Sequence, residues 1–202
     1  MTGNGFVKLP FYGAGQRIGL FGGSFNPAHA GHEHVALTAL RRLQLDWLWV
    51  LVTPGNPLKS SPQQSVQKRM TVLRQQLHHP RIVVTDIEQQ AGLRYTLDTI
   101  RFLKMRAPDA NFVWVMGADN LKTFHAWQGW KKITQILPVC IVDREAGKFA
   151  AQNSKAAQHF ASFRHAPEQA AALPYMDAPA WIFLHGRHIP FSSTALRNAA
   201  RP

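Results

Sequence analysis

The sequence has a single cysteine, few acidic residues and no long apolar run. Cys140 stands alone among 202 residues, which excludes an intrachain disulfide and a CxxC metal or redox motif. No apolar stretch approaches the ~20 residues that a membrane-spanning helix needs, and no signal-peptide core follows the start. These absences predict a cytoplasmic protein that does not associate with a membrane.

The shortage of acidic residues leaves the chain strongly basic. Eleven Asp and Glu face 23 Lys and Arg, for a net charge of +12. Such a balance fits a nucleic acid, a polyphosphate substrate or a merely well-solvated surface. The basic residues are scattered, and no recognition-helix or RNA-binding motif accompanies them, so a nucleic-acid partner is not predicted.

Buried strands and helices alternate along the chain. This pattern predicts an α/β fold with a doubly wound parallel sheet. Residues 1–16 are expected to form a loose N-terminal extension and residues 17–202 a single domain, with short helices and loops over 143–180. Predicted strands cover 18–21, 47–53, 82–84, 111–116, 137–142 and 181–184, and predicted helices cover 31–43, 66–77, 95–105 and 121–133.

A glycine-rich turn with two histidines follows the first predicted strand. It reads Gly-Gly-Ser-Phe-Asn-Pro-Ala-His-Ala-Gly-His over residues 22–32. Ligands bind beyond the carboxyl ends of parallel strands, where glycines let backbone amides approach a phosphate. His29 and His32 are three residues apart at a helix start, so both imidazoles can donate to charge developing on phosphorus. Chance occurrence and metal ligation are the alternatives, although no third ligand cluster is evident.

A second candidate anion site lies near the end of the chain. Ser192, Ser193 and Thr194 offer hydroxyl caps and backbone amides at a helix start, and Arg197 adds a cation one turn later. Alone, this segment also fits an ordinary capped helix. Together the two motifs resemble the signature of the HxGH nucleotidyltransferase superfamily, in which the histidines contact ATP phosphates and the closing segment holds the β- and γ-phosphates. The resemblance implies a Rossmann-like nucleotidyltransferase fold.

Residues between the two motifs are candidates for choosing the acceptor. Asp119 can hydrogen-bond ribose hydroxyls, and Trp127 can stack on a flat cationic ring. Trp127 and Trp130 are also compatible with simple core packing. The run Val-Met-Gly-Ala-Asp-Asn-Leu-x-x-Phe-His-x-Trp-x-x-Trp over 115–130 resembles the bacterial nicotinate-mononucleotide adenylyltransferases. In that family the tryptophan stacks on the pyridine ring.

Three further segments extend this resemblance. Tyr95 and Thr96 match a Ser/Thr-Tyr-Thr segment that holds the nicotinate end, where backbone N–H groups can donate to the pyridine carboxylate and so favour the acid over the amide. In the loop over 56–59, leucine replaces the histidine of the family's Pro-Pro-His-Lys, so only Lys59 is carried over as a phosphate contact. Arg144 matches a phosphate-contacting arginine, with a solvent-facing arginine as the alternative.

The resemblance implies adenylyl transfer from ATP to nicotinate mononucleotide, which yields deamido-NAD and pyrophosphate in NAD biosynthesis. Phosphopantetheine is the rival acceptor, which the Trp127 segment disfavours because a pantetheine arm has no aromatic ring. Mg²⁺ is expected to bridge ATP oxygens with few protein ligands, and no metal-binding residue is assigned. The sequence leaves open whether the protein forms a homo-oligomer. The expected catalytic residues are His29, His32, Lys59 and Arg197. The expected ATP-binding residues are Gly22, Gly23, Ser24, Phe25, Gly117, Asp119, Ser192, Ser193 and Thr194. The expected nicotinate-nucleotide-binding residues are Tyr95, Thr96, Trp127 and Arg144.

Overall fold

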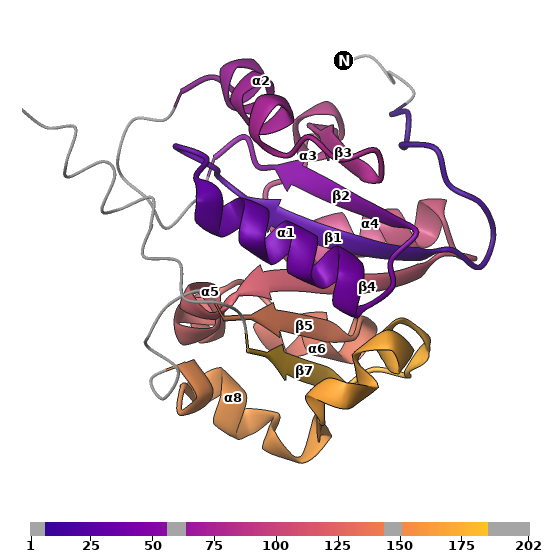
Figure 1. The fold of residues 1–202 in the computed structure, drawn as a ribbon, viewed down its shortest axis with the longest axis vertical. Helices are drawn as coiled ribbons and strands as arrows, with labels where there is room; N and C mark the ends of the chain where they lie inside the picture. The colour runs from indigo at the N-terminus through magenta and orange to yellow at the C-terminus, as the bar shows by residue number, and fades with distance from the viewer. Residues whose placement is uncertain (1–6, 56–63, 144–150, 186–202) are drawn as a thin grey trace, which may run out of the picture.

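Parallel strands form the centre of the computed structural model, which describes residues 7–55, 64–143 and 151–185 (Figure 1). In these residues seven strands pair in the order β3-β2-β1-β4-β5-β7-β6, and every pair is parallel. The predicted doubly wound parallel sheet is therefore confirmed. The strands are β1 (Arg17–Gly23), β2 (Trp47–Val52), β3 (Ile82–Thr85), β4 (Asn111–Gly117), β5 (Val139–Val142), β6 (Arg164–His165) and β7 (Trp181–Leu184).

The helices connect successive strands and cover both faces of the sheet. The α-helices are α1 (Ala30–Arg42), α2 (Val66–Gln76), α3 (Ile87–Gln90), α4 (Thr96–Arg106), α5 (Ala118–Thr123), α6 (Trp130–Ile136) and α8 (Lys155–His159). The 3-10 helices are η1 (Phe124–Ala126), η2 (Ala161–Phe163) and η3 (Pro167–Tyr175). Among these helices none is both long and apolar enough to cross a bilayer.

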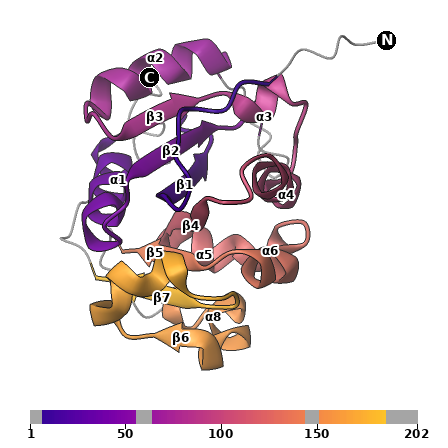
Figure 2. The same ribbon diagram turned by 90° about the vertical axis from the view of Figure 1, so that its right-hand side faces the viewer.

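Alternating side chains of the strands build one core on each face of the sheet. On β4, Phe112, Trp114 and Met116 pack with α4, α6 and α8, whereas Val113 and Val115 pack with α1, α2 and η3. Figure 2 shows this division, with α1 on one side of the sheet and α4 and α6 on the other. The continuous apolar runs of the strands follow from this burial on both faces.

The strand order reverses between β1 and β4. Both strands pair directly, yet β1 continues into α1 on one face and β4 into α5 on the other. In Figure 1 the arrows of the strands point to the edge at which α1 and α5 begin. Open parallel sheets bind ligands at such a switch point, beyond the carboxyl ends of the strands.

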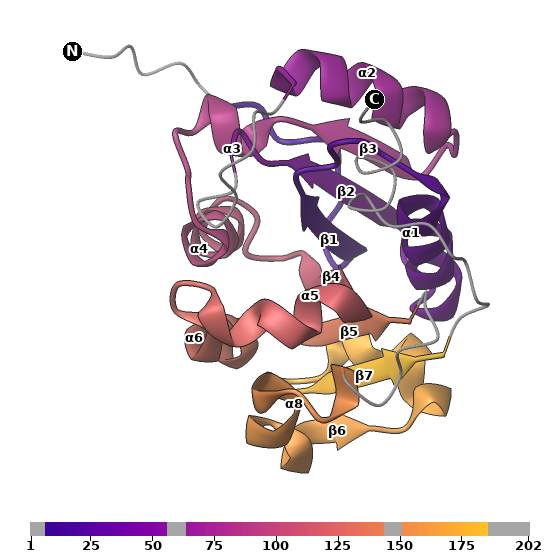
Figure 3. The same ribbon diagram turned by 90° about the vertical axis from the view of Figure 1, so that its left-hand side faces the viewer.

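The segment before β1 contacts the core, although the division into an extension and a domain stays a prediction. Val7 is buried, and the ring of Tyr12 lies edge-on to Trp49 with centroids 6.1 Å apart. Arg106 donates to the carbonyl of Val7 at 3.1 Å. Residues 7–16 therefore add to the core on the face of the sheet that α4 covers, and Figure 3 shows α4 and α1 on opposite sides of the sheet.

Candidate active site

His29 and His32 cap the first turn of α1 reciprocally. His29 is the N-cap residue, and its Nδ1 accepts from the backbone N–H of Gly31 at 3.1 Å. The backbone N–H of His29 in turn donates to Nδ1 of His32 at 3.2 Å. The two rings lie 3.8 Å apart between centroids, with 34° between their planes. The structure thus brings together the two histidines that the sequence spacing paired.

These hydrogen bonds define which ring nitrogen carries the proton. Because each Nδ1 accepts from a backbone N–H, the proton of each neutral imidazole belongs on Nε2. Both rings are therefore Nε2–H donors, held at the positive end of a 13-residue helix. Paired donors at a helix N-terminus suit a phosphate that gains charge during transfer.

Two aromatic rings pack against the imidazole of His32. The ring of Phe25 lies edge-on to the imidazole with centroids 4.9 Å apart, and Phe21 follows at 6.3 Å. Phe25 is buried and has a φ of 46°, an uncommon backbone conformation for a bulky residue. Its side chain acts as packing for the histidine pair, while its predicted contact with ATP stays a prediction.

The two glycines that end β1 are needed for packing as well as for access. An added Cβ at Gly22 would lie 2.6 Å from Cη2 of Trp114 on the neighbouring strand. At Gly23 it would lie 3.0 Å from the ring of Phe25. The sequence suggested only that glycine leaves the backbone open to a phosphate, whereas the structure shows aromatic rings filling the space of both side chains.

Gly22→Ala is expected to lower the free energy of unfolding by about 1–3 kcal/mol, because the ring of Trp114 is buried and cannot move aside freely. Gly13→Ala is the matched control, since the nearest atom to its Cβ would lie at 3.6 Å. The control should stay within about 0.5 kcal/mol of the wild type. Urea unfolding measures both variants, and equal stabilities would contradict the packing role of Gly22.

Trp127, which is predicted to contact the acceptor, packs on the ring of Trp114. Trp127 is half-buried, with its ring centroid 6.3 Å from Trp114 and 5.3 Å from Phe124. Gly129 adopts a φ of 66°, and an added Cβ there would lie 2.5 Å from Leu97 of α4. The turn after Trp127 therefore packs on the first turn of α4, which starts with Thr96 after the half-buried N-cap Tyr95.

The end of β4 supplies the remaining predicted ATP-side residues. Gly117 is buried and is the N-cap residue of α5, and the half-buried Asp119 lies in the first turn of that helix. Because β4 pairs with β1, these residues share the carboxyl edge of the sheet with Ser24 and the histidine pair. Ser24 is half-buried directly after β1.

Six predicted site residues lie outside the described residues, so their roles stay predictions: Lys59, Arg144, Ser192, Ser193, Thr194 and Arg197. The strands that lead toward them nevertheless end at the edge that carries the histidine pair. Val52 of β2 pairs with Gly23, and Val142 of β5 pairs with Gly117 and Leu184. The carboxyl ends of β2, β5 and β7 therefore lie on the side of the predicted ATP site.

Two buried charged residues under the site were not predicted from the sequence. Arg69 is 2% exposed and donates to three backbone carbonyls, while Glu88 is 6% exposed and accepts from the hydroxyl of Thr99. The burial of Arg69 could have been predicted from the sequence. This residue lies on the apolar face of α2, three residues after Val66 and four before Leu73. An arginine in that stripe is buried only where acceptors surround it.

Glu88→Gln gives a prediction on the pH dependence of stability. Burial raises the pKa of Glu88 above its ordinary value of 4.5, against the opposing effect of hydrogen bonds with Thr99 and Thr53. The folded protein therefore binds this proton more tightly than the unfolded chain does. Its stabilising effect is complete below the unfolded pKa and is lost as the pH rises through the folded pKa.

Across that window the wild type should lose stability relative to Glu88→Gln, by up to about 1.4 kcal/mol per pH unit. Urea unfolding of both proteins at a series of pH values measures the difference. A difference that is independent of pH from below 4.5 to neutrality would show that Glu88 keeps its ordinary pKa in the folded protein.

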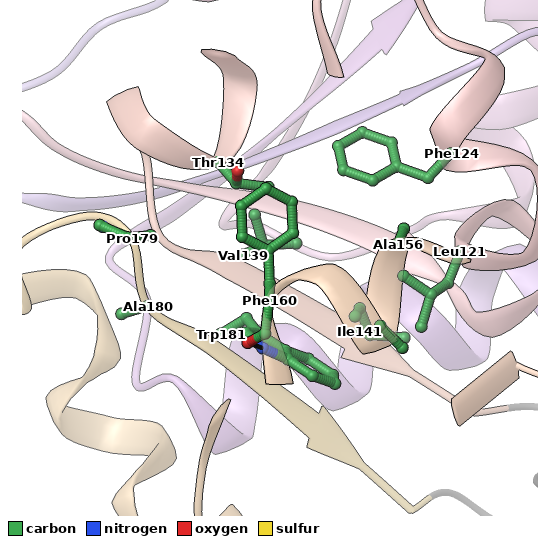
Figure 4. Close-up of a pocket in the computed structure, with 11 residues that line it drawn as sticks. Leu121, Phe124, Thr134, Val139, Ile141, Ala156, Phe160, Pro179, Ala180 and Trp181 are labelled. Atoms are coloured by element: carbon green, nitrogen blue, oxygen red, sulfur yellow. Dashed lines mark hydrogen bonds between the residues drawn. The ribbon is translucent and has the colours of Figure 1, made fainter. Parts of the chain in front are cut away.

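An apolar pocket lies elsewhere, between the sheet and helices α5, α6 and α8 (Figure 4). Phe124, Phe160 and Trp181 contribute rings to it, and among the described residues Thr134 is the only one that brings a hydroxyl to its lining. The indole N–H of Trp181 donates to the carbonyl of Phe160 at 2.7 Å. A lining with so few donors does not suit a phosphate-bearing ligand, so this pocket is not the candidate active site.

The fold and the histidine pair at its switch point define a Rossmann-like nucleotidyltransferase. A model of the cytidylyltransferase-like family matches residues 20–199. The chain is 51% identical over 182 residues to a probable nicotinate-nucleotide adenylyltransferase of Methylorubrum extorquens (strain PA1), covering 90% of this chain and 98% of the relative. A relative of the same name from Agrobacterium fabrum is 48% identical, with 90% and 97% covered.

Solved structures show the same fold at low sequence identity. Nicotinic acid mononucleotide adenylyltransferase of Plasmodium falciparum, complexed with NaAD, matches with a TM-score of 0.67 at 16% identity, over 91% of this chain and 83% of that chain. The same protein complexed with APC matches with a TM-score of 0.65. The present chain belongs to the cytidylyltransferase-like family and, within it, to the nicotinate-nucleotide adenylyltransferases.

Proposed function

We propose that this protein transfers the adenylyl group of ATP to nicotinate mononucleotide, forming deamido-NAD and pyrophosphate in NAD biosynthesis. The observation that carries the proposal is the reciprocal His29–His32 cap, which directs two Nε2–H donors from the N-terminus of α1 at the β1/β4 switch point. Relatives that share about half of the sequence bear the name of this activity. The name of these relatives specifies nicotinate mononucleotide as the acceptor, whereas the geometry alone supports only a phosphate-bearing acceptor.

The reaction is a single in-line displacement. A 5′-phosphate oxygen of nicotinate mononucleotide forms a bond to the α-phosphorus of ATP, and the bond from that phosphorus to the bridging oxygen of pyrophosphate breaks. Little covalent chemistry is required of the protein, which positions the two phosphates and neutralises charge. His29 and His32 donate to phosphate oxygens, and Lys59 and Arg197 neutralise the leaving pyrophosphate.

The two substrates occupy opposite sides of the switch point in this proposal. The ATP side uses the glycines after β1, Ser24, Phe25, the β4–α5 turn with Gly117 and Asp119, and the segment 192–194. The acceptor side uses Trp127 against the pyridine ring, Tyr95 and Thr96 at the start of α4, and Arg144. Support comes from the packing of the Trp127–Gly129 turn on Leu97, which places these two acceptor segments side by side.

Mg²⁺ is proposed to arrive with ATP. The described residues contain no group of three His, Cys, Asp or Glu side chains that could hold a metal ion. Mg²⁺ commonly binds substrate phosphates with one or two protein carboxylates, and the half-buried Asp119 at the ATP side is of that chemical type. Bound there, the ion would neutralise phosphate charge during the displacement.

The test is pyrophosphate release from ATP with each of three acceptors: nicotinate mononucleotide, nicotinamide mononucleotide and phosphopantetheine. We expect the highest kcat/KM with nicotinate mononucleotide, and a reaction without acceptor serves as the control. Faster transfer to phosphopantetheine would refute the proposed acceptor. Tight, salt-dependent binding of random oligonucleotides without any transfer would favour a nucleic-acid-binding protein instead.

A further inference from the structure

Arg69 of α2 is a buried arginine without an ionic partner. Its side chain is 2% exposed, and no carboxylate pairs with it in the part of the chain that the structure describes. Its Nη2 is buried and donates to no group among those residues. Burying a charge without an ion pair costs free energy, which hydrogen bonds to neutral carbonyls must offset. The positions of those carbonyls therefore indicate what Arg69 does.

The guanidinium of Arg69 joins three segments at the carboxyl edge of the sheet. Its Nη1 donates to the carbonyl of Ser24, directly after β1, at 2.7 Å and to that of Thr53, directly after β2, at 2.9 Å. Its Nε donates to the carbonyl of Gln64, ahead of α2, at 2.9 Å. Because the donors of a guanidinium lie in a rigid plane, this one group fixes the three carbonyls relative to one another.

The carbonyl of Ser24 belongs to the peptide unit that precedes Phe25. The φ torsion of Phe25 is 46°, and its ring lies edge-on to the imidazole of His32 with centroids 4.9 Å apart. An unfavourable backbone conformation persists only where surrounding contacts hold it. The hydrogen bond from Arg69 is such a contact, because it fixes the direction of the peptide unit from which that torsion starts.

We propose that Arg69 is a positioning residue for His32. Its hydrogen bond to Ser24 fixes the backbone of Phe25, and the ring of Phe25 keeps Nδ1 of the His32 imidazole on the backbone N–H of His29. Arg69 thus acts through Phe25 and needs no contact with either substrate. The inference rests on the proposed function, because it assumes that His32 donates to a phosphate during transfer.

The position of the His32 imidazole matters because in-line displacement is sensitive to geometry. A misplacement of about 1 Å can lower the rate by about a hundredfold. The three segments that Arg69 joins include no residue of the proposed acceptor side. We therefore expect changes at Arg69 to slow transfer and to raise KM for ATP, with KM for nicotinate mononucleotide close to its wild-type value.

Single-turnover rates of Arg69→Met and Arg69→Lys test this role. Arg69→Met removes the charge and every donor, and the rate should fall about a hundredfold. Arg69→Lys keeps the charge and three donors but not their planar arrangement, so the rate should fall only about tenfold. Arg69→Lys decides the matter if Arg69→Met does not fold.

Arg81→Met is the matched control for these variants. Arg81 also donates to a backbone carbonyl, that of Leu45 at 3.0 Å, but both residues lie ahead of strands, at the amino edge of the sheet. The control should keep the transfer rate and both KM values of the wild type.

Phe25→Leu tests the residue through which Arg69 is proposed to act. Leucine keeps a buried apolar side chain but offers no ring to His32, so the rate should fall about tenfold. In the double variant Arg69→Lys/Phe25→Leu the loss should fall well short of the hundredfold product, because both changes break the same path. Losses that multiply would show that Arg69 acts independently of Phe25, and they would overturn the proposal.

Nitrogen-15 NMR of the imidazoles in the substrate-free protein gives a readout apart from activity. The wild type should show the Nε2–H tautomer for His32, because its Nδ1 accepts from the backbone N–H of His29. Arg69→Lys and Phe25→Leu should both lower the population of this tautomer at His32, whereas Arg81→Met should leave it unchanged.

Two further outcomes overturn the proposal. A folded Arg69→Lys that transfers at the wild-type rate, with only its thermal stability lowered, would show that Arg69 is purely structural. Slower transfer with an unchanged tautomer at His32 would show that Arg69 acts on ATP by another route. The wild type is assayed first, so that absence of transfer there refutes the proposed function, while the tautomer of the substrate-free protein still tests the positioning.

Discussion

His32→Ala is expected to lower turnover by about two orders of magnitude or more while the fold stays intact, since one preorganised donor to a developing phosphate charge is removed. The substitution also removes the acceptor for the backbone N–H of His29, so a loss of about 1 kcal/mol in stability accompanies it. Turnover with saturating ATP and nicotinate mononucleotide measures the first effect, and urea unfolding measures the second.

A second variant separates catalysis from helix capping. In His32→Asn the side-chain oxygen can occupy the position of Nδ1 and accept from His29, but nothing replaces the Nε2–H donor. Turnover should fall as far as in His32→Ala, with the stability largely recovered. His78→Ala, at an exposed histidine after α2, is the control and should keep full activity. Normal turnover in both His32 variants would show that the imidazole is not part of the catalytic machinery.

The sheet was predictable because its strands are buried on both faces. β2 and β4 are continuous apolar runs whose side chains are buried on both faces. Such runs are typical of the inner strands of a parallel sheet covered by helices on both sides. The two-residue strand β6, in contrast, was not predicted. Arg164 and His165 carry no apolar pattern, and they join the sheet only because the edge of β7 is available for pairing.

The break between α5 and α6 illustrates a second limit. The sequence suggested helical material over 121–133, and the structure divides it into α5, the 3-10 helix η1 and α6, which starts only at Trp130. Gly129, the N-cap of α6, adopts the left-handed conformation, and a side chain there would also collide with Leu97 of α4. The start of α6 at Trp130 thus depends on contacts with another helix, and local helix propensity does not predict it.

Some features of the candidate site could be predicted from the sequence, and others could not. Its histidine pair was predictable as two residues three apart at a helix start, but His29 is the extended N-cap residue, and the reciprocal capping hydrogen bonds are what bring the two rings together. The hydrogen-bond partners of the buried Arg69 and Glu88 were not predictable, since they include two carbonyls and a hydroxyl contributed by segments 11–45 residues away. The packing role of Gly22 likewise depends on Trp114 from the adjacent strand, which becomes a neighbour only once the sheet forms.

Trp127→Ala should raise KM for nicotinate mononucleotide by tenfold to about a hundredfold with little change in KM for ATP. Stacking of a flat base on an aromatic side chain contributes about 1–3 kcal/mol, which corresponds to this range. A cationic pyridine ring adds an electrostatic attraction to the face of the indole. The half-buried position of Trp127, edge-on to Trp114 and Phe124, holds the ring in one orientation and reduces the entropy lost on stacking.

Core packing alone predicts a different result for Trp127, because its ring contacts Trp114, which fills the space beside Gly22. If packing were its only role, Trp127→Ala would lower stability and disturb both substrates alike. Trp127→Phe, which retains an aromatic face, should keep KM for the acceptor within a few fold. Trp130→Phe is the matched control, since Trp130 shares the contact with Phe124 but otherwise packs on His159 and Phe160, and it should not change acceptor binding. A selective effect on the acceptor in Trp127→Ala, absent from the Trp130 variant, therefore distinguishes stacking on the substrate from support of the core.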